Sequence, residues 1–133
     1  MDPPTNPVTC AGTLARQMID ADIVNPPSLS EIAMAAGLSP FQMSRLFYRV
    51  NGVSIPEYIR RLRVDAAEEL LKSTQLNIGE VAVRVGYKSM AAFSRAFLRE
   101  RGKNPSALRR DDSDIMHLRR TASGRLEDVV TRA

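Results

Sequence analysis

The sequence is poor in the residues that most often carry enzymatic or metal chemistry. Of its 133 residues, one is a cysteine, one is a histidine and none is a tryptophan. A single cysteine cannot form an internal disulfide or a thiolate cage, which favours a reducing cytoplasm. A single histidine excludes paired-histidine metal motifs and offers no serine-histidine-aspartate set, and no glycine-rich phosphate loop is present. We therefore expect no cofactor, no metal and no enzymatic activity.

Long apolar runs are also missing. No stretch approaches the roughly 20 apolar residues that a membrane helix needs, and we find no secretory signal segment. At 133 residues the chain has room for one domain or two very small ones. We expect no membrane partner and no separate ligand-binding domain.

Positive charge is abundant in one part of the chain. Residues 40–110 hold 14 lysines and arginines and six acidic residues, whereas residues 1–39 hold one arginine and four acidic residues. Such a concentration favours a polyanionic partner, and a merely solvated basic face is the alternative.

The same part of the chain contains a repeat. Residues 30–37 return as residues 78–86, each copy ending in a glycine, Gly37 or Gly86, with an alanine four residues before it. The glycines are 49 residues apart. Phe47 and Phe97, which follow them, are 50 apart, so one residue has been added within the second copy. A small residue followed by a glycine turn is typical of a helix-turn-helix, whose second helix enters a DNA major groove.

The chain is thus predicted to be all-α, with two helix-turn-helix subdomains joined by a long linker helix. Ser54, Pro56 and Glu57 form a helix-start signature for that linker. Its apolar stripe at helical spacing comprises Tyr58, Ile59, Leu62, Ala66, Leu70 and Leu71. About 18 residues give a rod of roughly 27 Å, close to the ~34 Å between successive major grooves. The predicted boundaries are a disordered lead-in at 1–10, the first subdomain at 11–53, the linker helix at 54–73, the second subdomain at 74–110 and a flexible tail at 111–133.

The helix predicted over residues 40–50 has two chemically different faces. One is apolar at helical spacing and is expected to be buried: Met43, Leu46, Phe47 and Val50. The outward face carries Phe41, Arg45 and Tyr48, flanked by Gln42, Ser44 and Arg49. Arginine suits guanine, glutamine suits adenine, and an exposed ring suits a thymine methyl. For Phe41, a core or interdomain aromatic remains the alternative.

The second recognition helix, predicted to begin near Ser89, is less polar. Its expected buried residues are Phe93, Ala96 and Phe97. Its outward face carries Ala91, Arg95 and Leu98, flanked by Met90, Ala92, Ser94 and Arg99. Lys88 and Ser89 at the helix start are candidates for phosphate contacts, as are Arg49 and Arg99. We expect less sequence discrimination from this copy than from the first.

These residues resemble the DNA-binding domain of the AraC/XylS transcriptional regulators over residues 11–110. The first copy and linker carry Leu29, Ser30, Glu31, Ile32, Ala33, Leu38, Ser39, Pro40, Ser44, Arg45, Leu46, Phe47, Gly52, Pro56, Tyr58, Arg63, Leu70 and Leu71. The second carries Val81, Ala82, Val85, Gly86, Tyr87, Phe93, Ser94, Arg95, Ala96, Phe97, Gly102, Pro105 and Arg109, similar to the family's signature segment. The resemblance implies about seven helices and a bacterial transcription factor whose monomer spans two major grooves. By position it implies base contacts from Ser39, Phe41, Gln42, Ser44, Arg45, Met90, Ala91, Ala92, Ser94 and Arg95.

The predicted function is therefore sequence-specific binding of double-stranded DNA by a stand-alone regulator, or by a domain excised from a longer one. A monomer on DNA is expected, with dimerisation through the tail or Cys10 left open, and RNA polymerase is the expected partner of an activator. The chief alternative is a helical interaction module or anti-activator with weakened DNA binding. A methyl-acceptor repair enzyme using Cys10 is the enzymatic alternative, although such a thiolate needs stabilising groups and the histidine, His117, is remote in sequence.

Overall fold

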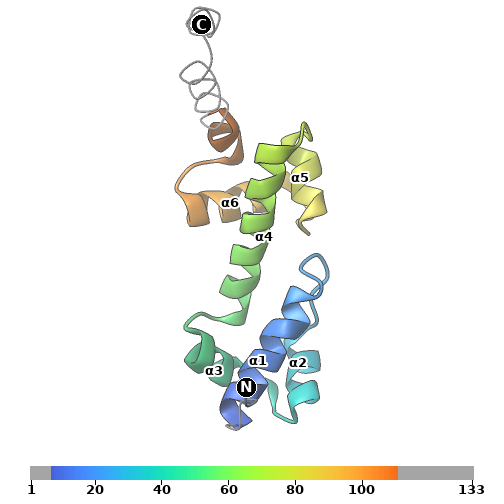
Figure 1. Cartoon of the computed structure of the whole chain (residues 1–133), viewed down its shortest axis with the longest axis vertical. Coiled ribbons are helices and arrows are strands. Elements are labelled where there is room, and N and C mark those ends of the chain that lie inside the picture. Colours follow the sequence, from blue (N-terminus) through green and yellow to red (C-terminus); the bar gives the residue numbers. More distant parts are fainter. Residues whose placement is uncertain (1–6, 111–133) are drawn as a thin grey trace, which may run out of the picture.

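The computed structural model describes residues 7–110, which contain helices and no strand. The helices are α1 (Pro7–Asp20), α2 (Leu29–Ala36), α3 (Pro40–Asn51), α4 (Ile55–Ser73), α5 (Ile78–Arg84) and α6 (Met90–Arg101), followed by a helical segment at residues 105–110. Figure 1 shows α4 as a central rod with α1, α2 and α3 at one end and α5 and α6 at the other. We call α1–α3 the first lobe and α5, α6 and the final segment the second lobe. Within residues 7–110, the predicted all-α class and the two subdomains joined by a linker helix are confirmed, and these seven helical segments agree with the prediction of about seven.

The predicted lead-in ends too late. Helix α1 begins at Pro7 and ends at Asp20, so residues 7–10 are helical. Proline suits the first position of a helix because its φ is already helical and its missing N–H has no partner to lose there. The proline that we interpreted as part of an unstructured segment therefore starts the helix. Residues 1–6 and the predicted tail at 111–133 lie outside the described residues.

Each lobe has its own hydrophobic core, and α4 contributes to both. The first core comprises Ala15, Ile19, Ile32, Ala33, Met43, Phe47 and Ile55. The second comprises Val64, Ala67, Leu71, Val81, Ala82, Val85, Phe93, Ala96, Phe97 and Leu108. The predicted apolar stripe of α4 did not include Val64 and Ala67, which are fully buried. One stripe cannot describe α4, because its first half packs against the first lobe and its second half packs against the second lobe.

Helix α1 packs closely on α3 of the first lobe. A Cβ added at Gly12 would lie 2.7 Å from Val50 Cγ1, so only glycine permits this approach of α1 to α3. At the other end of α1, the Tyr58 hydroxyl donates a hydrogen bond of 2.6 Å to Asp20 Oδ1. Burial, followed by this hydrogen bond, raises the pKa of Tyr58. These contacts fix α1 against both α3 and α4.

The two helix-turn-helix turns have the same pattern of backbone hydrogen bonds up to the added residue. In the first, the Gly37 N–H donates to Met34 O and the Leu38 N–H to Ala33 O. The equivalent donors of the second turn, Gly86 N–H and Tyr87 N–H, bond Val83 O and Ala82 O. The helix caps that follow are Ser39 and Ser89, so the residue added in the second copy is Lys88.

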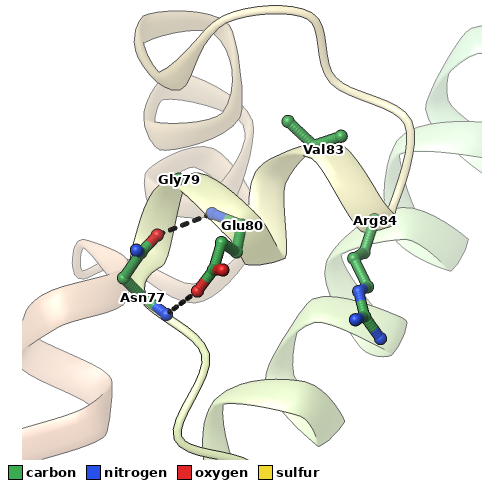
Figure 2. A pocket seen from close by; sticks show the side chains of 5 residues that line it. All are labelled: Asn77, Gly79, Glu80, Val83 and Arg84. Atoms are coloured by element: carbon green, nitrogen blue, oxygen red, sulfur yellow. Dashed lines mark hydrogen bonds between the residues drawn. The ribbon is translucent and has the colours of Figure 1, made fainter.

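Reciprocal capping fixes the start of the first helix in each pair. Ser28 caps α2 with Glu31, and Asn77 caps α5 with Glu80. Figure 2 shows both Asn77–Glu80 hydrogen bonds, whose lengths are 2.9 and 2.8 Å. Asn77 and Glu80 also line an open groove of about 420 Å³. Since each cap satisfies backbone N–H groups that the helix leaves without partners, these two short helices begin at defined residues.

Candidate nucleic-acid interface

Helix α3 begins with a capping box that uses two of the predicted base-contacting residues. Ser39 Oγ accepts from the Gln42 N–H at 3.1 Å, and Gln42 Oε1 accepts from the Ser39 N–H at 2.9 Å. Both side chains are exposed. A bidentate contact of Gln42 to adenine needs Oε1 as an acceptor, so it would share this oxygen with the cap or release the cap. The Gln42 amide N–H groups remain free to donate to a base acceptor.

The outward face of α3 carries an aromatic ring and an arginine in contact. Phe41 is 69% exposed, which excludes the core or interdomain alternative. The Arg45 guanidinium carbon lies 5.4 Å from the Phe41 ring centroid. Because a cation is attracted to the face of an aromatic ring, Phe41 restrains the orientation of Arg45 at the helix surface. Tyr48, one turn further on, is 60% exposed.

The predicted contact residues of the first lobe lie together on one exposed surface. Ser39, Phe41, Gln42, Ser44, Arg45 and Arg49 are all exposed, whereas Met43 and Phe47 on the opposite side of α3 are buried. Two shallow hollows follow this surface, of about 320 and 540 Å³, and Arg45 and Arg49 line both. The structure therefore places these six side chains where a ligand outside the lobe can reach them.

Helix α6 presents a surface with fewer polar groups. Its cap is Ser89, whose Oγ accepts from the Ala92 N–H at 3.1 Å. Met90 and Leu98 are 52% and 53% exposed, and Ala91, Arg95 and Arg99 are exposed as well. Ala92 and Ser94 are half-buried, and Lys88 and Ser89 are exposed in front of the helix. All fourteen predicted contact residues of the two lobes thus reach the surface at least in part.

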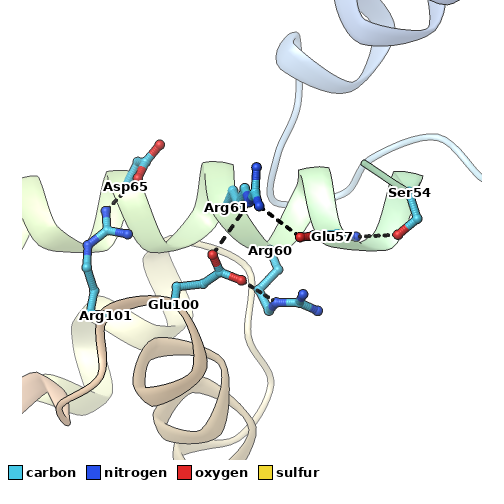
Figure 3. Close-up of polar contacts among 7 residues, drawn as sticks. All are labelled: Ser54, Glu57, Arg60, Arg61, Asp65, Glu100 and Arg101. Carbon is cyan, nitrogen blue, oxygen red and sulfur yellow. Dashed lines mark hydrogen bonds and ion pairs between the residues drawn. The ribbon is translucent and has the colours of Figure 1, made fainter. Parts of the chain in front are cut away.

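Ion pairs fix α6 against the linker helix. Arg60 Nε donates to Glu100 Oε2 at 2.7 Å, and Arg101 Nε donates to Glu68 Oε1 at 2.6 Å, with Arg101 also paired to Asp65. Figure 3 shows Glu100 and Arg101 of α6 reaching side chains along α4. Hydrogen bonds from Lys72 and Arg101 lower the pKa of Glu68. The two ion pairs of Glu68, with Arg101 and Lys72, are therefore formed at neutral pH and are lost as acid protonates Glu68.

Some basic residues within the positively charged part of the chain have internal partners. Arg61 pairs with Glu57 at 2.9 Å, a spacing of four residues within α4 that the sequence does show. Arg109 donates to the backbone carbonyls of Leu71, Leu76 and Thr74 and joins the final helical segment to the end of α4. No sequence signal revealed that contact, because a carbonyl acceptor is available from any residue type.

A family model described as a helix-turn-helix domain matches residues 32–111. The regulatory protein SoxS of Salmonella typhimurium is 34% identical over 93 residues, covering 70% of this chain and 87% of SoxS. The chain belongs to the AraC/XylS family. As a member of that family it is a DNA-binding helix-turn-helix transcriptional regulator.

The fold agrees with a solved member of the family. The crystal structure of an AraC-type regulator from Chromobacterium violaceum superposes with a TM-score of 0.70 at 28% identity, covering 77% of this chain and 92% of the other. A bifunctional relative, the transcriptional activator and DNA repair enzyme AdaA of Bacillus subtilis, is 31% identical over 96 residues. That match covers 72% of this chain and 46% of AdaA, so the chain spans about half the length of that relative.

The enzymatic alternative depends on Cys10 and on groups that could stabilise its thiolate. Cys10 lies exposed on α1, and His117 is outside the described residues. Among residues 7–110, no group of three or more histidine, cysteine, aspartate or glutamate side chains is placed to hold a metal ion. The helices in that range also include none with the length and apolar character required to cross a bilayer.

Proposed function

We propose that this regulator inserts α3 and α6 into two successive major grooves of one DNA duplex. The observation that carries the proposal is the pairing of two capped helices, with exposed outward faces, at opposite ends of α4. With 19 residues, α4 is about 28 Å long. Successive major grooves are ~34 Å apart, so one monomer has the dimensions to reach both. We expect it to act in the cytoplasm, where chromosomal DNA lies, and an activator of this kind would also contact RNA polymerase.

In this proposal the first lobe supplies most of the base contacts. Arg45 donates to guanine O6 and N7, Phe41 lies against a thymine methyl, and Gln42 donates to a base acceptor. Ser39 and Ser44 complete the set of side chains at the groove. Arg49, one turn after Arg45, contacts phosphate and positions the helix without reading sequence.

The second lobe makes fewer hydrogen bonds to bases. Arg95 and Ser94 are its polar candidates, while Met90, Ala91 and Ala92 contribute apolar contacts to thymine methyls and fit the groove by shape. Ser89, Lys88 and Arg99, with the N-terminus of α6, hold the adjacent phosphates.

Replacing Ala91 with glutamine is expected to add a base preference to the second half-site, which is the stretch of DNA contacted by α6; the first half-site is the stretch contacted by α3. The amide of Ala91→Gln can pair with adenine N6 and N7, which the parent alanine cannot do. The preferred site would first be selected from a random duplex pool. A base-by-base affinity scan should then show a new preference within the second half-site and little change in the first. An unchanged second half-site would contradict the placement of Ala91 at the base edges.

The same scan of the parent tests the division of labour between the lobes. We expect mismatch penalties of about 1–3 kcal/mol in the first half-site and smaller penalties in the second. A second half-site as stringent as the first would contradict this part of the proposal.

Removing Lys88 is expected to weaken all DNA sequences equally. A lost phosphate contact makes the plot of log affinity against log salt concentration shallower by about one unit. The measurement is binding of Lys88→Ala to the selected site and to random duplex between about 50 and 200 mM salt. The matched control is Lys72→Ala, whose ammonium pairs with Glu68 at 2.9 Å and which should keep the parent slope. A parent-like slope for Lys88→Ala would remove that residue from the interface.

The anti-activator alternative has one structural observation in its favour, the exposed apolar surface of Met90 and Leu98 on α6. If α6 binds a protein and not DNA, substitutions on α6 should leave DNA affinity unchanged. Ala91→Gln and Arg95→Ala therefore distinguish the two functions, because DNA binding by α6 requires both to alter the second half-site.

A further inference from the structure

The two lobes approach one another at Arg63, in the middle of α4. The loop between α1 and α2, residues 21–28, extends from the first lobe along α4 towards the second (Figure 1). Arg63 Nε donates to the carbonyl of Ile23 at 2.7 Å, and its Nη2 donates to the carbonyl of Val24 at 3.2 Å. The guanidinium carbon also lies 5.1 Å from the ring centroid of Tyr87, in the turn before α6. One side chain thus contacts the loop of one lobe and the recognition turn of the other. We call these four residues the Arg63 clamp.

The turn of the second lobe is packed tightly against this clamp. At Gly86, with φ of +107°, an added Cβ would lie 3.0 Å from Arg63 Cζ and 3.0 Å from Val24 Cα. At Gly37, the equivalent glycine of the first lobe, an added Cβ would meet nothing within 4 Å. The close approach is therefore a property of the junction between the lobes and not of the helix-turn-helix turn itself.

Beyond the clamp, the lobes are joined by α4, which packs on α3, contributes Ile55 to the first core and bonds Asp20 of α1 through the Tyr58 hydroxyl. Helices α1, α2 and α3 pack on one another, and α4, α5 and α6 do the same. An open groove of about 410 Å³ adjoins the clamp, with Pro26 of the first lobe, Tyr87 of the second and several α4 residues on its walls. Without the clamp, the angle between the lobes would depend on α4 itself and on the packing of its first half against α1 and α3.

We propose that Arg63 is a positioning residue that sets the distance between half-sites accepted by one monomer. This inference rests on the proposed binding to two grooves. Moving one half-site by a base pair shifts it by about 3.4 Å and turns it by about 35° around the DNA axis. A lobe held at a fixed angle cannot follow that turn without breaking the clamp, whereas a lobe released from the clamp can. Arginine suits this role because its planar fork bonds two carbonyls while its face stacks on a ring, and lysine cannot do both.

The first test compares Arg63→Met with the parent on duplexes whose half-sites are at the preferred spacing or one base pair closer or further apart. The parent should lose about tenfold or more in affinity at either altered spacing, equivalent to about 1.4 kcal/mol. Arg63→Met should bind the preferred spacing about five- to tenfold more weakly, because the aligned arrangement is then populated only part of the time. Its loss at altered spacing should shrink to about two- to threefold, and its affinity for an isolated half-site should match the parent's.

The matched control is Arg61→Met, which removes the same charge from the same helix. Arg61 contacts Glu57 and Glu100 and has no contact with loop 21–28 among its ion pairs. Arg61→Met should therefore show the same dependence of affinity on half-site spacing as the parent. The second variant is Arg63→Lys, which keeps the charge and should behave as Arg63→Met does. It replaces Arg63→Met in the test if circular dichroism shows that the methionine variant is unfolded.

The second test measures the clamp without DNA. Spin labels on Cys10 and on Val83→Cys, which is at a position 66% exposed, report the distance between the lobes by electron paramagnetic resonance. The parent and Arg61→Met should give a narrow distance distribution, and Arg63→Met and Arg63→Lys a broad one. A parent-like distribution, or parent-like dependence on spacing, in the Arg63 variants would overturn the proposal. A parent without any preferred spacing would instead contradict binding to two grooves, and the distance distributions alone would then decide the clamp.

Discussion

Replacing Phe47 with alanine is expected to lower the free energy of unfolding by about 3–5 kcal/mol. Phe47 is fully buried in the first core and packs edge-on against Tyr58, with ring centroids 5.6 Å apart. Removing the ring leaves a cavity between α1, α3 and α4, and the helices around it can close only partly. The measurement is urea unfolding of the parent and of Phe47→Ala, followed by circular dichroism. A variant without any cooperative transition also meets this expectation.

The same helix provides a matched control. Phe41 is six residues before Phe47 but 69% exposed on the opposite face, so Phe41→Ala should change stability by no more than about 0.5 kcal/mol. It should weaken DNA binding instead, because the ring would be missing from the groove and from its contact with Arg45. Similar losses of stability in both variants would contradict the assignment of the two faces of α3.

Replacing Arg45 with alanine is expected to weaken binding to the preferred site by about 1–3 kcal/mol and to relax base choice at one position. Arg45 is exposed, and the Phe41 ring restrains its guanidinium, so the two proposed bonds to guanine would form at a small cost in side-chain entropy. The measurement is the affinity of Arg45→Ala for the selected site, for the four base pairs at the affected position and for random duplex.

The control for this variant is Arg49→Ala, on the same helix. A phosphate contact carries no sequence information, so Arg49→Ala should weaken selected and random DNA by the same factor. If Arg45→Ala also lost equally on both, its role as the base-contacting residue would be wrong.

The general architecture could be predicted because its signals are local and repeated. A small residue, a glycine and an apolar face at fixed spacing occur twice, and each is set by the geometry of one helix pair. The small residues are Ala33 and Ala82, which are 1% and 2% exposed in their cores. The outward face of α3 followed from helical periodicity alone, since 100° per residue places Phe41 and Arg45 opposite Met43 and Phe47.

The contacts between distant segments could not be predicted in the same way. Gly12 would ordinarily weaken the interior of a helix, and only the packing of Val50 against it explains its presence. Arg63 is one of the residues that carry the family resemblance, but its contacts could not be predicted, because its partners are the backbone carbonyls of a loop about 40 residues away in sequence. Positive charge alone therefore does not distinguish an arginine with internal partners, such as Arg63 or Arg109, from one on an exposed surface.

Two predicted base-contacting side chains, Ser39 and Gln42, also form the capping hydrogen bonds of α3. Periodicity and family resemblance placed Ser39 and Gln42 at the groove, where both are exposed, but their oxygens already cap α3. A capping box is visible in the sequence as serine followed three residues later by glutamine. The sequence alone does not show that one side chain has to serve both the helix and the base, which depends on where the DNA lies.

The central claim is that one monomer contacts two successive major grooves. Hydroxyl-radical footprinting of the selected duplex, on a complex isolated at one chain per duplex, tests it most directly. The account predicts two protected patches on one face of the DNA, separated by about 10–10.5 base pairs, and the loss of one patch alone when the half-site bound by α6 is scrambled. Protection confined to a single groove, or a complex that forms only with two chains per duplex, would contradict it.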